Sequence, residues 1–364
     1  MDLDSLRERL RNLDHQILTL ASRRQEIAVA IGREKLQAGL PTRDYRQEKD
    51  VVQRARDSAA ELGLPPALAE RITLALIEAS LTVQERDKVS RHAGGNGRRV
   101  LVIGGAGRMG GWMVGFLASQ GFEVEIADPS GAAPGFAHRD DWRTGALDHD
   151  IIVVAAPLRT SNGILLEMAA SPPPGVVLDI GSLKGPLREG LLALAETGAR
   201  VASIHPLFGP GTELLSHRHI VFVDLGSPQA TRQAKELFAS TLAVPVDMDL
   251  EAHDRFMAYV LGLSHALSIA FVDALANSGA TAPRLAGLSS TTFDAQLAIA
   301  ETVSRENPSL YFEIQSLNGY GPDALTAAIE ALDRVRSIVK SGDEDAFVGL
   351  MEKGRAYLDQ RGAR

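Results

Sequence analysis

The chain has 364 residues, of which 45% are hydrophobic and 23% charged, so it can form two or three domains with ordinary cores. A formal net charge of −8 and an aromatic content of only 5% argue against a nucleic-acid-binding role. The absence of cysteine excludes disulfides, thiolate metal sites and cysteine nucleophiles, and we predict no metal site.

The N-terminal segment, MDLDSLRERLRNLD, is charged and amphipathic and lacks the apolar centre of a signal peptide. No uninterrupted apolar run approaches the roughly 20 residues that are needed to cross a bilayer. We therefore expect a cytoplasmic protein without membrane contact. Basic residues are relatively concentrated in the first 91 positions, which suits either solvated helix faces or a site for a small polyanion.

Three helices are predicted at the N-terminus. Apolar residues recur at helical spacing over 3–37, and Gly39 and Pro41 end this unusually long helix. Two further helices are predicted at about 42–62 and 67–89, separated by a glycine and two prolines. A helix of roughly 35 residues cannot cover its own apolar face, so we expect an intertwined homodimer.

The periodicity changes after residues 91–97 (RHAGGNG), a short glycine-rich segment that is typical of a linker. A strand at 99–104, a helix at 112–120 and a strand at 122–127 form a βαβ unit. Later apolar runs alternate with helical or loop segments, as a doubly wound sheet requires, and from Leu250 onward the pattern is helical. These runs cover 151–155, 176–180, 201–204 and 220–223.

The turn GGAGRMG lies between that first strand and its helix and has the spacing Gly-x-Gly-x-x-Gly of a dinucleotide-binding turn. Its glycines allow a tight turn, a close approach to a pyrophosphate and close packing of the helix, although a purely structural turn has the same form. Asp128 ends the next strand, where a carboxylate binds ribose hydroxyls and repels a 2′-phosphate, so NAD is favoured over NADP. The predicted cofactor contacts are Gly105, Gly107, Arg108, Met109, Gly110, Asp128 and Pro157.

Three later segments each follow a predicted strand: AAPLRTSN (155–162), DIGSLKGP (179–186) and SIHPLFGPG (203–211). Ligands bind at the carboxyl ends of the strands of an open α/β sheet, so all three should converge near the nicotinamide. Their Ser-x-Lys and His-Pro-x-Phe-Gly-Pro elements, in this order, resemble the prephenate and arogenate dehydrogenase family. The resemblance extends from about Arg98 to the C-terminus.

This resemblance implies that His205 is the catalytic histidine, with Ser182 beside it and Lys184 near the substrate or cofactor. It also implies that His265 contacts the substrate, whereas His253 suits a structural role. Removal of hydride from a carbon that bears a hydroxyl needs a base for the hydroxyl proton, and histidine has a suitable pKa. A histidine that only shapes a turn is the alternative for His205.

Residues 3–88 resemble the all-helical chorismate mutases, whose reaction is a pericyclic rearrangement that needs no nucleophile. The site must hold a dianion in a compact chair and stabilise charge on the breaking ether bond. Any one match alone would suit a solvated helix face, but seven polar positions match over three helices. They are Arg7, Arg24, Lys35, Asp44, Glu48, Ser80 and Gln84.

The mutase resemblance also implies a role for each group. Arg24 of one subunit and Arg7 of the other would hold the two substrate carboxylates. Lys35 and Gln84 would donate to the ether oxygen. Glu48 and the backbone at position 44 would bind the ring hydroxyl through hydrogen bonds.

Two positions depart from the family patterns. The arginine that precedes the family glutamate is replaced by Gln47, although Arg46 stands next to it. The arginine that binds the ring carboxylate of prephenate in many relatives is replaced by Thr302. We predict that Arg305, one helical turn further on, supplies this charge, with Arg255 as the second candidate.

The expected fold class is therefore multidomain. An all-α three-helix chorismate mutase domain (1–90) and a linker (91–97) precede an α/β Rossmann-type NAD-binding domain (98–248). An all-α C-terminal substrate and dimerisation domain (249–364) follows. No small regulatory domain is expected after it.

The expected function is a bifunctional enzyme of tyrosine biosynthesis that converts chorismate to prephenate and then, with NAD, prephenate to 4-hydroxyphenylpyruvate. One alternative is an enzyme for the 4-amino-4-deoxy analogues of both substrates. A second is a dehydrogenase whose mutase-like domain only supports dimerisation. A third is a nucleotide-sensing regulator without catalysis.

Overall fold

The computed structural model describes residues 2–91, 94–131 and 133–360. Residues 92 and 93 of the predicted linker, residue 1 and residues 361–364 of the predicted outer domains lie outside the described residues. The chain divides into two compact units. The first comprises Met1–Ser182 and Glu189–Met248, and the second comprises Leu183–Arg188 and Asp249–Arg364.

The first unit begins with three helices, α1 (Leu3–Gln37), α2 (Tyr45–Glu61) and α3 (Pro66–Arg91), close to the predicted bounds. The Asp2 carboxylate caps α1 by accepting the backbone N–H of Ser5 at 2.8 Å. Helices α1 and α2 both pack against α3.

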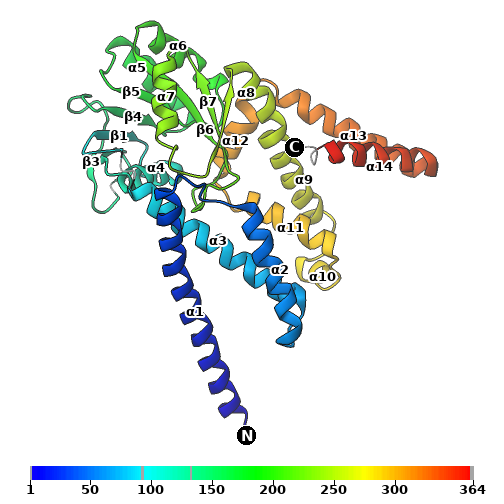
Figure 1. The fold of residues 1–364 in the computed structure, drawn as a ribbon. Coiled ribbons are helices and arrows are strands. Elements are labelled where there is room, and N and C mark those ends of the chain that lie inside the picture. The colour runs from blue at the N-terminus through cyan, green and yellow to red at the C-terminus, as the bar shows by residue number, and fades with distance from the viewer. Residues whose placement is uncertain (1, 92–93, 132, 361–364) are drawn as a thin grey trace. The chain divides into compact units, whose positions relative to one another are not determined.

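The N-terminal half of α1 carries an uncovered apolar face. Its large apolar side chains are 47–69% exposed, and Figure 1 shows this part of the helix as the free blue end of the ribbon. An apolar surface of this kind marks a protein interaction site, which is compatible with the intertwined dimer expected from the sequence. The exposed residues are Leu3, Leu6, Leu10, Leu13, Ile17, Leu18 and Leu20.

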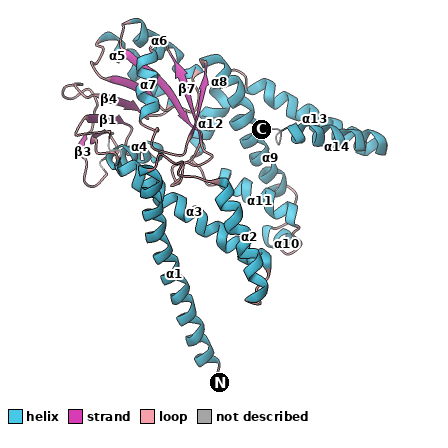
Figure 2. Ribbon diagram, viewed as in Figure 1, coloured by secondary structure: helices cyan, strands magenta, loops and turns pink. Residues whose placement is uncertain are grey.

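The rest of the first unit is an eight-stranded sheet in the order β3-β2-β1-β4-β5-β6-β7-β8. Figure 2 draws its strands in magenta among the helices. All neighbouring strands are parallel except β6 and β7. The chain order reverses direction between β1 and β4, which is where doubly wound sheets bind nucleotides. The strands are β1 (Arg99–Ile103), β2 (Glu123–Ala127), β3 (Ala137–Arg139), β4 (Ile151–Val154), β5 (Val176–Asp179), β6 (Arg200–Pro206), β7 (His219–Asp224) and β8 (Val244–Met248).

Apolar side chains of the strands and of the helices between them form one buried core. Strands β1, β4 and β5 are almost wholly buried, because helices cover both faces of a parallel sheet. The helices are α4 (Arg108–Ser119), α5 (Leu158–Ala170), α6 (Arg188–Glu196) and α7 (Pro228–Glu236). The short 3₁₀ helix η1 (Gly185–Leu187) belongs to the second unit.

Three elements differ from the sequence-based prediction. Helix α4 begins at Arg108 rather than at Trp112. The prediction missed the first turn because that turn contains two glycines, which are poor helix formers. Strand β3 has only three residues without apolar alternation, and β8 contains Pro245, so neither shows the pattern of a strand. Both lie at the edges of the sheet.

The second unit is helical after residue 249. Helix α9 packs against α11, and the π-helix η2 packs against α13. The side-chain amide of Gln315 donates to the backbone carbonyl of Gly262 in η2 at 2.8 Å. The elements are α8 (Leu250–Met257), η2 (Ala258–Leu263), α9 (Ser264–Ala276), α10 (Ala282–Ala286), α11 (Thr291–Ser304), α12 (Pro308–Leu317), α13 (Gly321–Ser341) and α14 (Glu344–Asp359).

The continuous helical stretch Leu250–Ala276 is long enough to cross a membrane, and an 18-residue window within it has a mean hydropathy of 1.6, which is apolar enough by composition. The expectation concerned uninterrupted apolar runs, and this stretch is interrupted by Ser264, His265 and Ser268. Length and composition do not show insertion, because a helix that packs on other helices meets the same criteria. This stretch packs on α11 and α13.

Candidate active sites

The glycine turn joins β1 to α4 at the edge where β1 ends. Gly105 lies in the turn, and Gly107 is the residue before the helix starts at Arg108 and Met109. A Cβ on Gly110 would lie 2.1 Å from the carbonyl oxygen of Gly104, so only glycine fits there. The helix N-terminus therefore approaches the strand closely enough to present its first N–H groups to a pyrophosphate.

Asp128 follows β2 and is only 7% exposed. Its Oδ2 accepts the backbone N–H of Ala106 in the glycine turn at 3.1 Å, and its Oδ1 accepts that of Ser130 at 2.8 Å. A carboxylate has about four acceptor positions, so two remain for ribose hydroxyls. These contacts hold the carboxylate beside the glycine turn, and the arrangement fits an adenine dinucleotide.

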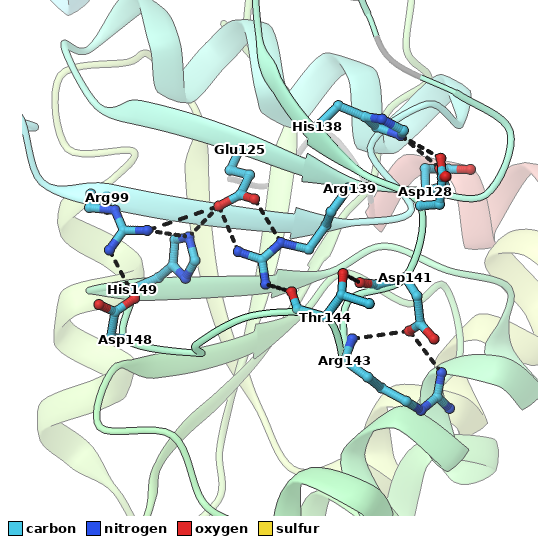
Figure 3. A network of polar contacts seen from close by, with 11 residues as sticks. Arg99, Glu125, Asp128, His138, Arg139, Asp141, Arg143, Thr144, Asp148 and His149 are labelled. Carbon is cyan, nitrogen blue, oxygen red and sulfur yellow. Dashed lines mark hydrogen bonds and ion pairs between the residues drawn. The ribbon is translucent and has the colours of Figure 1, made fainter.

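A polar network supports the β2 side of this edge (Figure 3). Glu125 on β2 accepts two hydrogen bonds from Arg139 on β3, at 2.6 and 2.8 Å, and one contact from His149 at 2.9 Å. The Arg139 hydrogen bond lowers the pKa of Glu125, whereas burial lowers the pKa of His149. The His138 ring contacts the backbone oxygen of Asp128 at 2.9 Å. Strand β3, which the sequence did not predict, therefore fixes the end of β2.

The candidate catalytic residues of the sheet lie at or just beyond the ends of strands at one edge. Ile103 is in register with Val154, Val154 with Asp179, and Asp179 with Ser203. Strand β6 continues beyond that level, so His205 lies past the end of β5.

His205 is 5% exposed and pairs with Val221 on β7. The sequence placed this histidine after its strand, but antiparallel pairing with β7 extends β6 to Pro206.

Ser182 follows β5 by three residues and leaves the same edge of the sheet. Its hydroxyl oxygen is buried and has no hydrogen-bond partner among the described residues. Buried hydroxyls normally have a partner, so this group suits a bound ligand. Pro157 lies at the start of α5, on the segment that follows β4.

In the second unit, Asp254 on α8 holds the backbone of the predicted Ser-x-Lys element. Its Oδ1 accepts the N–H of Lys184 at 2.7 Å, and its Oδ2 accepts that of Gly185 at 2.6 Å. A Cβ on Gly185 would lie 2.7 Å from Oδ2, which explains the glycine. The Lys184 side chain is fully buried.

Two neighbours position Asp254. The buried ring of His253 contacts Oδ1 through Nδ1 at 2.7 Å, and the Asn318 amide donates to the Asp254 carbonyl at 2.8 Å. Burial alone would raise the pKa of Asp254, but hydrogen bonds from His253 and from the two backbone N–H groups hold it below the ordinary value. Asp254 was not predicted from the sequence. The adjacent pair His253-Asp254 was the only local sign of it.

We expect Asp254→Asn to lower the free energy of unfolding by about 1–3 kcal/mol at pH 7, because an amide NH₂ would face a backbone N–H that now has an acceptor. The folded-state pKa of Asp254 is lowered, so its contribution is present above about pH 4 and is lost as the pH falls through that lowered value. Urea unfolding of both proteins at pH 7 and pH 3 measures this. The exposed Asp323→Asn serves as the control. An equal difference at both pH values would contradict the assignment.

His265 lies on α9, where its ring stacks on Tyr311 with centroids 4.3 Å apart. Burial lowers its pKa, so the ring is neutral at pH 7, and Nδ1 has no hydrogen-bond partner among the described residues. Arg305 follows α11, is 77% exposed and pairs with Glu301 at 2.5 Å. Thr302 is also exposed and bonds only the backbone of its own helix at 3.0 Å.

Six of the seven predicted mutase residues lie on the later part of α1, on α3 and at the start of α2, and two of them, Arg24 and Ser80, contact each other. Arg24 on α1 donates to the carbonyl of Leu76 at 2.6 Å and to the hydroxyl of Ser80 on α3. Gln84, one turn further along α3, is buried, and its Oε1 has no hydrogen-bond partner within the described chain. Lys35, near the end of α1, donates to the carbonyl of Thr42 at 2.9 Å.

The start of α2 carries the other two residues of this group. Asp44 caps the helix through its side chain, which accepts the N–H groups of Arg46 and Gln47 at 3.1 Å each. Glu48 forms a two-point ion pair with Arg43, at 3.0 and 2.9 Å. The cation beside Glu48 is therefore Arg43 and not Arg46, which the sequence placed next to the missing family arginine.

Arg7 is the predicted residue that does not join this group. It lies 17 positions before Arg24 on the same helix, which corresponds to roughly 26 Å along the axis. Its side chain is 61% exposed and contacts Asp4 at 3.4 Å. Within one chain, Arg7 cannot reach the group around Arg24.

Two parts of the chain match known protein families. Residues 6–85 match the chorismate mutase type II family. Residues 249–353 match the dimerization domain of prephenate dehydrogenase. Both resemblances expected from the sequence are confirmed.

The chain is similar over almost its whole length to two proteins named T-protein. That of Enterobacter agglomerans is 24% identical over 366 residues, covering 100% of this chain and 95% of the relative. That of Haemophilus influenzae is 23% identical, with 98% and 92% covered. A 4-amino-4-deoxyprephenate dehydrogenase of Streptomyces pristinaespiralis is 29% identical over 276 residues, covering 73% of this chain and 93% of the relative.

Solved structures share the fold of the later part of the chain. A prephenate dehydrogenase from A. aeolicus, in complex with hydroxyphenyl propionate and NAD+, is 18% identical with a TM-score of 0.57, covering 72% of this chain and 98% of that one. A Synechocystis arogenate dehydrogenase is 16% identical with a TM-score of 0.56, covering 72% and 99%. The predicted fold class is confirmed.

Proposed function

We propose that this chain, which joins a chorismate mutase type II domain to a prephenate dehydrogenase dimerization domain, is a bifunctional enzyme of tyrosine biosynthesis. It rearranges chorismate to prephenate and then oxidises prephenate with NAD to 4-hydroxyphenylpyruvate and carbon dioxide. The observation that carries the proposal is the presence of both family domains in one chain, on either side of a dinucleotide-binding sheet.

In the dehydrogenase reaction, His205 accepts the proton of the ring hydroxyl as the carbon that bears it is oxidised. NAD, when bound, supplies the acceptor for the hydride of that carbon. The ring carboxyl group then leaves as carbon dioxide, and its bonding electrons complete the aromatic ring. Ser182 holds the reacting hydroxyl and Lys184 and His265 contact the substrate, while Asp128 holds the ribose of the cofactor.

In the mutase reaction, the protein holds one conformation of the substrate and stabilises the charge that develops on the ether oxygen. Lys35 and Gln84 donate to that oxygen. Arg24 and Ser80 hold a carboxylate, and Glu48 with the backbone at position 44 accepts the ring hydroxyl. Arg7 of a second subunit completes the site.

A cytoplasmic homodimer is part of this proposal. The exposed apolar face of α1 and the distance of Arg7 from its own site both support exchange of α1 between two subunits. The match of residues 249–353 to a dimerization domain supports a second contact between the same subunits.

The second candidate is the same pair of reactions on 4-amino-4-deoxychorismate and 4-amino-4-deoxyprephenate. The 29% identity to a 4-amino-4-deoxyprephenate dehydrogenase favours it, as does Thr302 in place of the family arginine. One assay separates the candidates: NADH production is measured with chorismate, prephenate and the two amino analogues. Faster turnover of the amino analogues would overturn the first proposal, and turnover of prephenate without that of chorismate would reduce the mutase domain to a structural role.

Asp128→Ser is expected to lower the ratio of kcat/KM with NAD to kcat/KM with NADP at least tenfold, because it removes the charge that repels the 2′-phosphate. The measurement is kcat/KM for each cofactor at saturating prephenate. Asp140→Ser, an exposed change on the segment that follows β3, is the control. A parent protein that already prefers NADP would contradict the role given to Asp128.

Arg305→Ala is expected to raise the KM for prephenate at least tenfold, because it removes the counter-charge predicted for the ring carboxylate. The exposed Arg334→Ala is the control, since Arg334 pairs only loosely with Glu330 at 3.9 Å. Arg255→Ala tests the second candidate cation. If neither Arg305 nor Arg255 matters, the ring carboxylate is held elsewhere.

A further inference from the structure

Two side chains of the mutase domain contact the loop that joins β6 to β7. This loop spans residues 207–218 and starts directly after His205 and Pro206. Residues 1–91 and the sheet belong to the same compact unit, so both contacts lie within one body. Neither side chain has a role in the proposed chemistry, which rests on their neighbours.

The first contact comes from Arg43. Two nitrogens of its guanidinium bind the Glu48 carboxylate, while the third, Nη1, contacts the Ser216 hydroxyl at 2.5 Å and His217 Nε2 at 2.6 Å. The Arg43 and Glu48 side chains are 21% and 20% exposed. The Arg43 guanidinium therefore contacts both the Glu48 carboxylate and the 207–218 loop.

His217 is held in an unusual backbone conformation at this contact. Its φ is +62°, in the left-handed region that non-glycine residues seldom adopt. Its ring also lies 5.9 Å from that of Tyr45 in the first turn of α2. Such a conformation persists only where surrounding contacts maintain it, so loss of the Arg43 contact would free this part of the loop.

The second contact comes from Glu85, the residue after Gln84 on α3. Its buried carboxylate accepts the backbone N–H of Leu215 at 2.8 Å and that of Leu242 at 2.5 Å. Burial raises the pKa of Glu85, and these two hydrogen bonds oppose the rise. The middle of the loop is attached to α4 of the sheet domain, because Trp112 Nε1 donates to the carbonyl of Thr212 at 3.0 Å.

We propose that Arg43 and Glu85 are positioning residues that tie the 207–218 loop to the mutase site, so that a ligand at Glu48 changes the KM for prephenate. The inference rests on the proposed function. A ligand whose hydroxyl binds Glu48 competes with Arg43 for the carboxylate. Arg43 then shifts relative to Ser216 and His217, and the loop that follows the catalytic histidine is altered.

The test is prephenate oxidation with and without a saturating oxabicyclic dicarboxylate shaped like the mutase transition state. The expected result for the parent protein is a change of at least threefold in the KM for prephenate, with the Kd for NAD unchanged. Calorimetry of the dicarboxylate with each variant shows that the mutase site is filled.

Ser216→Ala removes the loop side of the contact and should reduce the KM change to less than 1.5-fold, while mutase kcat is unchanged. Arg43→Ala should abolish the change as well, and Arg43→Lys should not restore it, because an ammonium cannot make the same three contacts. Arg46→Ala, an exposed neighbour on α2, should keep the full change.

A KM change that survives in Ser216→Ala and in Arg43→Ala would show direct competition at the dehydrogenase site and overturn the proposal. An unchanged KM in the parent protein with the mutase site filled would also overturn it. Failure of the proposed function is distinguishable, because the protein would then turn over neither chorismate nor prephenate.

Discussion

His205→Asn is expected to lower kcat for prephenate oxidation by about 10²–10⁴-fold, the usual contribution of a positioned general base. Asparagine is similar in size and can fill the same buried position, but it cannot accept a proton at neutral pH. The Kd for NAD should stay within twofold, because the proposed role concerns the transition state of the proton transfer.

Stopped-flow measurement of NADH formation and fluorescence titration with NAD give the two quantities separately. The control is His219→Asn, since His219 is exposed at the start of β7. Unchanged turnover in His205→Asn would remove this histidine from the mechanism. An equal loss of NAD binding would indicate a structural role at the end of β6.

Lys35→Ala is expected to lower the mutase rate by roughly a hundredfold to a thousandfold, the usual effect of removing one preorganised donor to a developing oxyanion. NAD reduction with supplied prephenate should remain, because the two sites use different elements. The contact of Lys35 with the Thr42 carbonyl also holds the turn between α1 and α2, so circular dichroism should show that the helices persist.

Lys49→Ala, an exposed change on α2, is the matched control for charge. Loss of both activities to the same extent would contradict the model of two separate sites. A mutase rate within tenfold of the parent would show that Gln84 alone can stabilise the ether oxygen.

Local patterns were enough to predict most of the elements. The long helix α1, the helices α2 and α3, and the β1-α4-β2 unit depend on periodicity, glycine and proline, which act within a few residues. Strands β3 and β8 were not predicted, because an edge strand pairs with only one neighbour and can therefore be short or contain proline.

The supports of the candidate sites could not be predicted in the same way. The Asp254 carboxylate reaches a backbone N–H that is 70 positions away, and Arg43 reaches a hydroxyl 173 positions away. Neither pair leaves a local pattern, since an aspartate after a histidine or an arginine before a helix also suits a solvated surface. The residues with proposed chemical roles could be predicted from the family resemblance. The side chains that position those residues were identified only from contacts across the fold.

The π-helix between α8 and α9 sets which direction the later helix faces. Each residue of an α-helix turns the chain by about 100°, and a π-type turn holds one additional residue without interrupting the helix. Loss of one residue from 258–263 would therefore rotate everything from Ser264 onward by roughly that angle relative to Asp254. His265 would leave the face that stacks on Tyr311, although no side chain of the pair had changed. In this segment the number of residues, rather than their chemistry, sets the orientation of the face that carries His265 relative to the face that carries His253.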